Sequence, residues 1–261
     1  MMHSQRYVSK ELTHFTGRRC RKADGTHDQE PQYRQLVEIL RAQRLLPRLD
    51  YVDGPARVNF DENASFEKRT MIKVDAVYFC DIPVADFGMH TDKYSTFGLS
   101  FLKSFLVGKG ANPAFYIAGD SIISPGDPAA SEVFNGRSPD PLTRNALMEQ
   151  LIKTQLTTAS DLRNTSLIEN SLTPLNHAAI ARAQKINSMV GRHFLSFCVP
   201  FDSTKDDADQ ENYYMEREWR VIGDVKFTLE DVCRVILPSP FARRLRSDVP
   251  DYAGQITFPD Y

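Results

Sequence analysis

The stretch Tyr213-Tyr-Met-Glu-Arg-Glu-Trp-Arg-Val221 decides the fold, because its second half has the pattern of a strand entering a core and holds the only Trp of the chain. Residues two apart on a strand share a face, so we expect Glu216 and Glu218 on one face and Arg217 on the other. A carboxylate on a central strand needs a partner or a function, because burying it alone costs free energy. A structural Glu–Arg pair at a sheet edge is the alternative interpretation.

Two earlier segments also place polar groups beside predicted strands. In the first, Thr13 to Arg18, His14 and Thr16 are two residues apart and on a strand would face a hydroxyl or an amide together. In the second, Val77 to Pro83, the ring of Tyr78 is suited to stacking on a planar ligand. The plainer interpretations are a strand-end histidine beside a solvated threonine, and an aromatic pair in the core.

The rest of the sequence predicts strands and helices without regular alternation. From Pro31 the spacing of Leu36, Val37, Ile39 and Leu40 predicts a helix with one buried face, and Pro47 marks its end. Another helix begins near residue 102 and stops at the glycines 108 and 110. The middle, 141–191, is helical, and polar stretches predict loops at 17–30, 119–140 and 202–211. The predicted strands are 6–16, 75–80, 95–101, 112–117, 193–199, 218–224 and 233–237. This order favours one α+β domain over 1–261, with 141–191 as a helical insertion.

The composition excludes several classes of protein. The chain has 261 residues, 41% of them hydrophobic, and no apolar run near the roughly 20 residues that span a bilayer. The start lacks the apolar stretch of a signal peptide, and the four Cys form no CxxC pair. We therefore expect a cytoplasmic protein with reduced thiols and no membrane partner. A net charge of −2 is not that of a nonspecific nucleic-acid binder.

Familiar catalytic motifs are absent. The sequence contains no GxGxxG, GxxxxGK[ST], HExxH or GxSxG. The six His are scattered along the chain and form no ligand pair at helical spacing, so we expect no metal site.

Two clusters of positive charge remain to be explained. They are Arg18, Arg19, Arg21 and Lys22, and Arg243, Arg244 and Arg246. Such clusters are usually solvated faces. The alternative is that they bring a nucleic-acid acceptor to the site, which would make binding strongly dependent on salt.

Several motifs together resemble the AbiGi family of bacterial abortive-infection (phage-defence) proteins, which are often labelled antitoxins. In order along the chain they are Tyr7–Thr13 followed by His14 and Phe15, Phe79–Pro83, His90 with Tyr94 and Phe97-Gly98, and Tyr213–Arg220. The resemblance implies a role in phage defence and a neighbouring toxin or antitoxin protein as partner.

The chain is more distantly similar to ADP-ribosyltransferases. The similarity rests on His14-Phe-Thr16, Ile39-Leu40 to Leu45-Leu46, Tyr78-Phe-Cys80 and Glu218-Trp-Arg-Val221, in that order, with Gln43-Arg44 where that family often has Gly. Glu216-Arg-Glu218 looks like the Glu-x-Glu of branches that modify arginine or nucleic acid. The similarity implies a split β-sheet core with a helical insertion and NAD as a substrate.

The resemblance also implies roles for individual residues. Glu218 would bind the ribose 2′-hydroxyl and stabilise an oxocarbenium-like cation, and Glu216 would position or deprotonate a protein or nucleic-acid acceptor. The residues implied to bind NAD are His14, Thr16, Gly17, Arg18, Tyr78, Tyr94 and Arg220. The alternative is a non-catalytic antitoxin or binding module that keeps the fold and neutralises a partner toxin.

Overall fold

The chain packs as two compact units. The structure is a computed structural model, which describes residues 9–47, 51, 54, 56–123, 142–166, 174–206, 209 and 211–259. Unit 1 comprises Met1–Ala56, Asp75–Ala114 and Asp206–Tyr261, and unit 2 comprises Arg57–Val74 and Phe115–Lys205. The single domain with an insertion at 141–191 stays a prediction.

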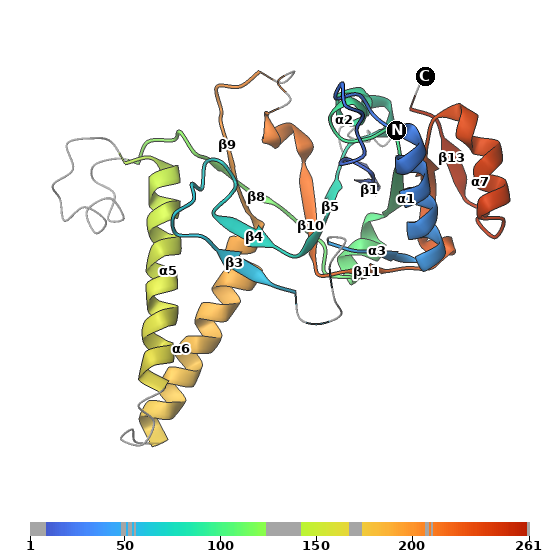
Figure 1. Ribbon diagram of the computed structural model, residues 1–261. Helices are drawn as coiled ribbons and strands as arrows, with labels where there is room; N and C mark the ends of the chain where they lie inside the picture. Colours follow the sequence, from blue (N-terminus) through green and yellow to red (C-terminus); the bar gives the residue numbers. More distant parts are fainter. Residues whose placement is uncertain are drawn as a thin grey trace, which may run out of the picture. The chain divides into compact units, whose positions relative to one another are not determined.

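Unit 1 is built on a seven-stranded mixed sheet in the order β13-β12-β6-β1-β5-β10-β7 (Figure 1). Only β12 and β13 pair in parallel, and the other neighbours are antiparallel. The strands are β1 (Glu11–Phe15), β5 (Ala76–Cys80), β6 (Gly98–Leu102), β7 (Asn112–Pro113), β10 (Glu218–Ile222), β12 (Val232–Ile236) and β13 (Gln255–Thr257). A two-stranded sheet joins β2 (Arg44–Leu45) to β11 (Val225–Lys226).

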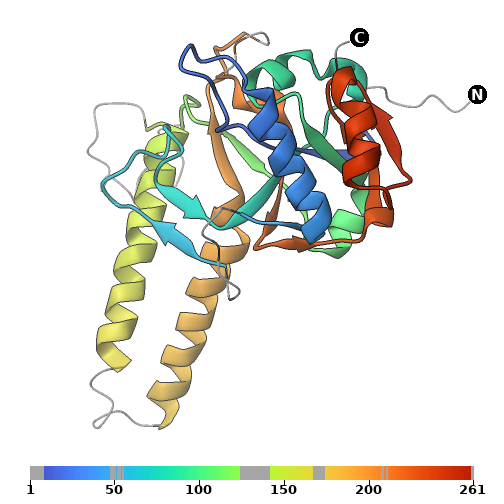
Figure 2. The ribbon, with the colours of Figure 1, turned by 45° about the vertical axis from the view of Figure 1, so that its right-hand side comes forward.

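Helices cover the apolar face of this sheet, and α1 and α7 lie side by side in Figure 2. The helices of unit 1 are α1 (Gln29–Ala42), α2 (Gly88–Lys93), α3 (Lys103–Gly108) and α7 (Ala242–Asp248). Its short 3-10 turns are η1 (Val84–Asp86), η4 (Tyr213–Glu216), η5 (Leu229–Asp231) and η6 (Ser239–Phe241). The main core joins α1, α3 and α7 to alternate strand residues such as Leu12, Phe79, Leu99 and Val221.

The predicted helix from Pro31 is confirmed, because α1 buries Leu36, Val37 and Leu40. It ends at Ala42 rather than near Pro47, since Gln43 adopts the left-handed conformation with φ 49° and its N–H donates to the carbonyl of Ile39. Glycine adopts this conformation most easily, so Gln43 carries a small backbone cost to end the helix there.

Unit 2 joins a helical hairpin to two small sheets. Its helices are α5 (Arg144–Ser166) and α6 (Pro174–His193), which pack against each other. The strands β3 (Val58–Phe60) and β4 (Ile72–Val74) pair antiparallel, and β8 (Phe115–Ala118) and β9 (Cys198–Phe201) pair in parallel. A turn, η3 (Leu195–Phe197), precedes β9, and the core holds Phe66, Met71, Ile152 and Leu195.

The expected α+β class is confirmed, and the structure shows a large mixed sheet with several helices. Two strand predictions are wrong in detail. The stretch 193–199 begins as the end of α6 and becomes a strand only at Cys198, and 112–117 divides into β7 and β8, which belong to different units. The predicted loop at 119–140 lies mostly outside the described residues, as does part of the predicted helical region.

Two leucines on β6 test which face of the sheet carries the core. Leu99 is completely buried, whereas Leu102 is 48% exposed. We expect Leu99→Ala to lower the free energy of unfolding by about 3 kcal/mol, because it leaves a cavity, and Leu102→Ala to lower it by less than about 1 kcal/mol. Urea unfolding followed by circular dichroism measures both, and equal losses would contradict the assignment of the faces.

Candidate functional site

The second face of the unit 1 sheet is unusually polar for a largely buried surface. Cys80 of β5 lies directly opposite Thr13 of β1 and opposite Glu218 of β10, so these three side chains share a face. On the same face Thr13 forms a hydrogen bond with Ser100 (2.7 Å), and Glu11 forms an ion pair with Arg234 (2.7 Å). A small apolar cluster that includes Cys80 covers part of this face.

Glu218 and Arg220 form a buried ion pair on this face. The Nε atom of Arg220 donates to Oε1 of Glu218 at 2.6 Å. Glu218 is 6% exposed and Arg220 is 5% exposed. Arg220 lies opposite Tyr78 in the sheet, with its guanidinium 5.4 Å from the centre of that ring. Tyr78 itself is 39% exposed, so it is not an ordinary core residue. The structure therefore places three of the predicted residues, Glu218, Arg220 and Tyr78, in a row of successive contacts.

Glu216 reaches the site by a different backbone path from the predicted one. It ends the η4 turn rather than lying on the strand, and Arg217 then adopts the left-handed conformation with φ 45°. The prediction that Glu216 and Glu218 share a strand face is therefore wrong. The Glu216 carboxylate is buried and accepts hydrogen bonds from Nζ of Lys93 (2.7 Å) and from the hydroxyl of Tyr94.

Tyr94 forms a direct hydrogen bond with one of the two carboxylates, that of Glu216. It follows α2, and its hydroxyl donates to Glu216. Burial raises the pKa of Tyr94, and the negative charges of Glu216 and, to a smaller extent, Glu218 raise it further. The exposed Arg18 guanidinium lies 4.9 Å from the centre of the Tyr94 ring. Glu216, Glu218, Tyr94 and Arg18 thus belong to one neighbourhood.

His14 joins this group through the backbone of Tyr78. Its Nδ1 lies 2.8 Å from the Tyr78 carbonyl oxygen, which only accepts hydrogen bonds, so Nδ1 carries the proton. Burial lowers the pKa of His14, and the bond to Tyr78 opposes this in part. The ring packs edge-on against Phe79, on the face of the main core. His14 therefore lies on the opposite face of the sheet from Glu218.

Thr16 and Gly17 lie just beyond the end of β1. The backbone N–H of Thr16 donates to the carbonyl of Phe97 (2.9 Å), and its buried hydroxyl has no hydrogen-bond partner among the described residues. Gly17 has φ 80° and lies against Gln32, whose side-chain amide donates to the Gly17 carbonyl (3.1 Å). This contact fixes the start of the loop that carries Arg18.

Asp81 is a residue of the site that the sequence reasoning passed over. It is buried, forms an ion pair with Lys103 (2.7 Å), and accepts a hydrogen bond from the backbone of Ser9. Its own N–H donates to the carbonyl of Arg217 (3.1 Å), so it holds the turn between the two glutamates. Its place at the end of a buried strand, before Ile-Pro, was the available signal.

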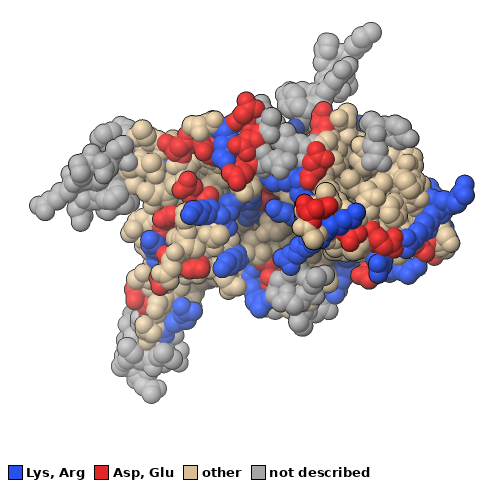
Figure 3. Space-filling view, turned by 45° about the horizontal axis from the view of Figure 1, so that its top comes forward, with Lys and Arg blue, Asp and Glu red and all other residues tan. Residues whose placement is uncertain are grey.

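Parts of the two basic clusters have internal roles. Arg21 donates to the carbonyls of Gly25 (2.7 Å) and Lys93 (2.9 Å), and so caps the end of α2. Arg244 forms ion pairs with Glu30 (2.8 Å) and Asp248 (3.4 Å). On the side of the molecule that Figure 3 shows, positive and negative side chains are interspersed. These observations favour structural roles for Arg21 and Arg244.

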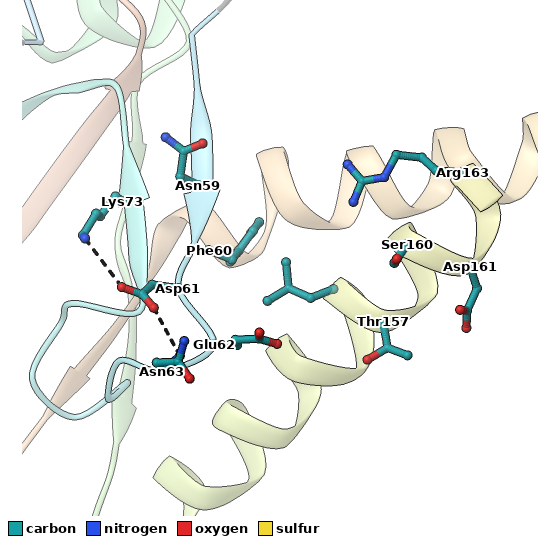
Figure 4. A pocket seen from close by; sticks show the side chains of 11 residues that line it. Asn59, Phe60, Asp61, Glu62, Asn63, Lys73, Thr157, Ser160, Asp161 and Arg163 are labelled. Carbon is teal, nitrogen blue, oxygen red and sulfur yellow. Dashed lines mark hydrogen bonds and ion pairs between the residues drawn. The ribbon is translucent and has the colours of Figure 1, made fainter. Parts of the chain in front are cut away.

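Unit 2 holds a separate groove that contains none of the predicted residues. It has a volume of about 740 Å³ and lies between the β3–β4 hairpin and α5 (Figure 4). Leu156 and Phe60 are its apolar residues, and Asp61, whose carboxylate is 3.8 Å from Nζ of Lys73, is one of its charged ones. A groove assembled from two segments so far apart in the chain has no local sequence signature.

Two further properties bear on cofactors and membranes. Within the described ranges, no group of three or more His, Cys, Asp or Glu side chains is arranged to hold a metal ion. The helices in the same ranges are too short or too polar to span a bilayer.

Comparison with known proteins gives no relative for this chain: no family model, curated protein or solved structure matches it.

Two glycines with similar backbone conformations test the contact between the Gly17 loop and α1. A Cβ on Gly17 would lie 2.6 Å from Cγ of Gln32, whereas a Cβ on Gly25 (φ 82°) would meet nothing within 4 Å. We expect Gly25→Ala to lower the free energy of unfolding by about 1 kcal/mol, from the backbone strain alone. Gly17→Ala should cost about 2 kcal/mol more, because of the added clash. Equal losses in urea unfolding would contradict the contact.

Two histidines, the half-buried His14 and the buried His90, predict a dependence of stability on pH. Burial lowers the pKa of both His14 and His90, so the unfolded chain binds protons on these residues more readily than the folded one. Their contribution to stability is present above the ordinary histidine pKa of about 6.5 and is lost as the pH falls below it. The double variant His14→Gln, His90→Gln should show a smaller loss of stability between about pH 7 and pH 5 than the wild type. An unchanged slope would contradict this assignment.

Proposed function

We propose that this chain is an NAD-consuming ADP-ribosyltransferase of phage defence, with the split-sheet core that its sequence resemblance implies. The observation that carries the proposal is the buried Glu218 at the start of β10, beside Arg220 and Tyr78. Tyr94 and the second carboxylate, Glu216, adjoin this row. A pair of carboxylates beside exposed aromatic surface and guanidinium groups matches what cleavage of NAD requires.

The reaction breaks the bond between C1′ of the ribose and the nicotinamide nitrogen. Positive charge develops on the ribose as the nicotinamide leaves with the bonding electrons, and a fixed carboxylate stabilises it. We assign this role to Glu218, whose carboxylate also accepts a hydrogen bond from the ribose 2′-hydroxyl. The exposed ring of Tyr78 stacks on the nicotinamide, with Tyr94 as the second aromatic side chain. The protein contributes positioning and charge, and no covalent intermediate is required.

In the proposed complex the NAD pyrophosphate replaces Glu218 as the partner of Arg220. A guanidinium binds a phosphate group through two parallel hydrogen bonds, as it binds a carboxylate. Arg18, exposed at the Tyr94 ring, is the second pyrophosphate ligand. When the Glu218–Arg220 pair opens, the Glu218 oxygen that had bound Arg220 becomes available to the ribose hydroxyl.

Glu216 acts on the acceptor. Lys93 and Tyr94 both donate hydrogen bonds to it, so its carboxylate is held in a fixed position. It takes the proton from an acceptor hydroxyl, guanidinium or base nitrogen as that atom bonds to C1′ of the ribose. A nucleic-acid acceptor and a protein acceptor are both compatible with this step.

Residues at the end of β1 and just beyond it support the substrate. The sequence resemblance assigns the adenine-side ribose to His14 and the orientation of the dinucleotide to Thr16 and Gly17. Because His14 lies on the core face and binds the Tyr78 carbonyl, its first role in this proposal is to hold β5 at Tyr78. The hydroxyl of Thr16 is then a donor for the dinucleotide.

A non-catalytic binding module, such as an antitoxin, is the second candidate. The same ion pair favours it, because a glutamate already paired with a buried arginine satisfies its own charge without a substrate. Such a protein would bind a neighbouring toxin whether or not Glu218 is present.

The decisive experiment compares NAD consumption by the wild type, Glu218→Gln and Glu230→Gln. Glu230 is an exposed carboxylate of the same unit and provides the matched control. We expect Glu218→Gln to lower the rate of nicotinamide release by at least about 100-fold, as loss of a transition-state charge does, and Glu230→Gln to leave it unchanged.

Folding is monitored in parallel, because breaking a buried ion pair destabilises a protein. Tyr78→Ala removes a partly exposed ring, so it should fold and still lower the rate by about 10-fold or more. Folded variants with unchanged NAD consumption, or a wild type that consumes no NAD in the presence of candidate protein and nucleic-acid acceptors, would overturn the proposal.

A further inference from the structure

The helix α6 carries a stripe of exposed cationic and apolar side chains along one side. We define the outer α6 face as Arg182, Lys185, Ile186, Met189 and His193, all of which are exposed. Their spacing of three or four residues places them on one side of the helix. Ile186 and Met189 at its centre are 62% and 52% exposed, and together they form a small exposed apolar patch.

The opposite side of α6 is held by α5. The side-chain amide of Gln155 donates to the carbonyl of Asn187 (2.9 Å), and that of Gln184 donates to the carbonyl of Leu162 (3.4 Å). Gly191 permits close packing, since a Cβ there would lie 3.0 Å from Gln155. The outer α6 face is therefore presented by a helix whose other side is fixed within the hairpin.

The charge of α6 has a single sign. Its sequence from Pro174 to His193 contains Arg and Lys but no Asp or Glu. Among the described residues, neither Arg182 nor Lys185 has an ion-pair partner, although acidic residues occur on α5. A cationic rim around two exposed apolar side chains is complementary to a surface that is acidic at its rim and apolar at its centre.

We infer that the outer α6 face binds an acidic amphipathic helix of a partner protein. A helix that carries leucines at a spacing of three, four and seven residues would place them against Ile186 and Met189. Its flanking glutamates would then lie near Arg182 and Lys185. Methionine suits such a surface, because its flexible side chain adapts to the residue packed against it.

Other occupants fit this face less well. In a symmetric contact between two copies, the α6 helices would bring like charges together. A nucleic acid would leave Ile186 and Met189 against phosphates and sugars, with no Phe, Tyr or Trp in the outer α6 face for stacking. A membrane surface calls for bulkier apolar residues such as Trp, Phe and Leu than this face offers.

The test measures binding of a synthetic helical peptide of about 18 residues, in which leucine forms one stripe and glutamate and alanine fill the rest. Fluorescence anisotropy reports the affinity for the full chain. We expect binding that weakens at high salt and weakens at least about 10-fold in Ile186→Ser, Met189→Ser and in Arg182→Glu, Lys185→Glu. The matched control is Ala181→Ser, Ser188→Ala, on exposed positions at the side of the same helix, and it should bind as the wild type does.

Three further probes separate the outcomes: a scrambled peptide of the same composition, vesicles with anionic lipid, and a DNA duplex. Preference for the striped peptide over all three supports the inference. Equal binding of the scrambled peptide, tighter binding of vesicles or DNA, no binding, or a wild type that dimerises through this face would each overturn it. Circular dichroism of every variant verifies that the hairpin is folded.

Discussion

The polar face of the unit 1 sheet is organised around the buried ion pair between Glu218 and Arg220. These two residues lie on the same face of a strand inside a seven-stranded sheet, where neither charge is stable without the other. The pair lies opposite Cys80 and Tyr78 in register, so that the neighbouring strand supplies the ring on which the guanidinium rests. A sheet with an apolar second face would have needed neither charge, and the retained polarity is what points to a site.

The backbone around the pair explains how a second carboxylate reaches the same place. Because Arg217 adopts the left-handed conformation, Glu216 and Glu218 leave the chain in directions that a regular strand does not allow, and Glu216 meets the hydroxyl of Tyr94. A non-glycine residue in this conformation costs roughly 1–2 kcal/mol, which the surrounding structure must offset. Asp81 supplies part of the stabilisation that offsets this cost. Its N–H donates to the Arg217 carbonyl, and its carboxylate forms an ion pair with Lys103.

Helices and strands whose positions depend on the local spacing of apolar residues could be predicted from the sequence. The spacing of Leu36, Val37 and Leu40 predicted α1, and the apolar runs predicted β5 and β10, because burial of one face fixes these elements. The sequence was insufficient where long-range contacts decide. The approach of Tyr94 to Glu216 joins residues 122 positions apart, and the side of the sheet on which His14 lies depends on strand pairing. The left-handed turn at Arg217 gave no sign in the sequence, because arginine rarely adopts that conformation.

We propose that Arg220 covers Glu218 until a dinucleotide takes its place, and a crystal structure with a non-hydrolysable carbocyclic NAD analogue would reveal this exchange. We expect the analogue's pyrophosphate to be bound by Arg220 and its ribose 2′-hydroxyl to lie within hydrogen-bond distance of Glu218. We also expect the nicotinamide to stack on Tyr78. An analogue bound elsewhere, or one bound beside an ion pair that stays closed at its present 2.6 Å, would contradict this proposal.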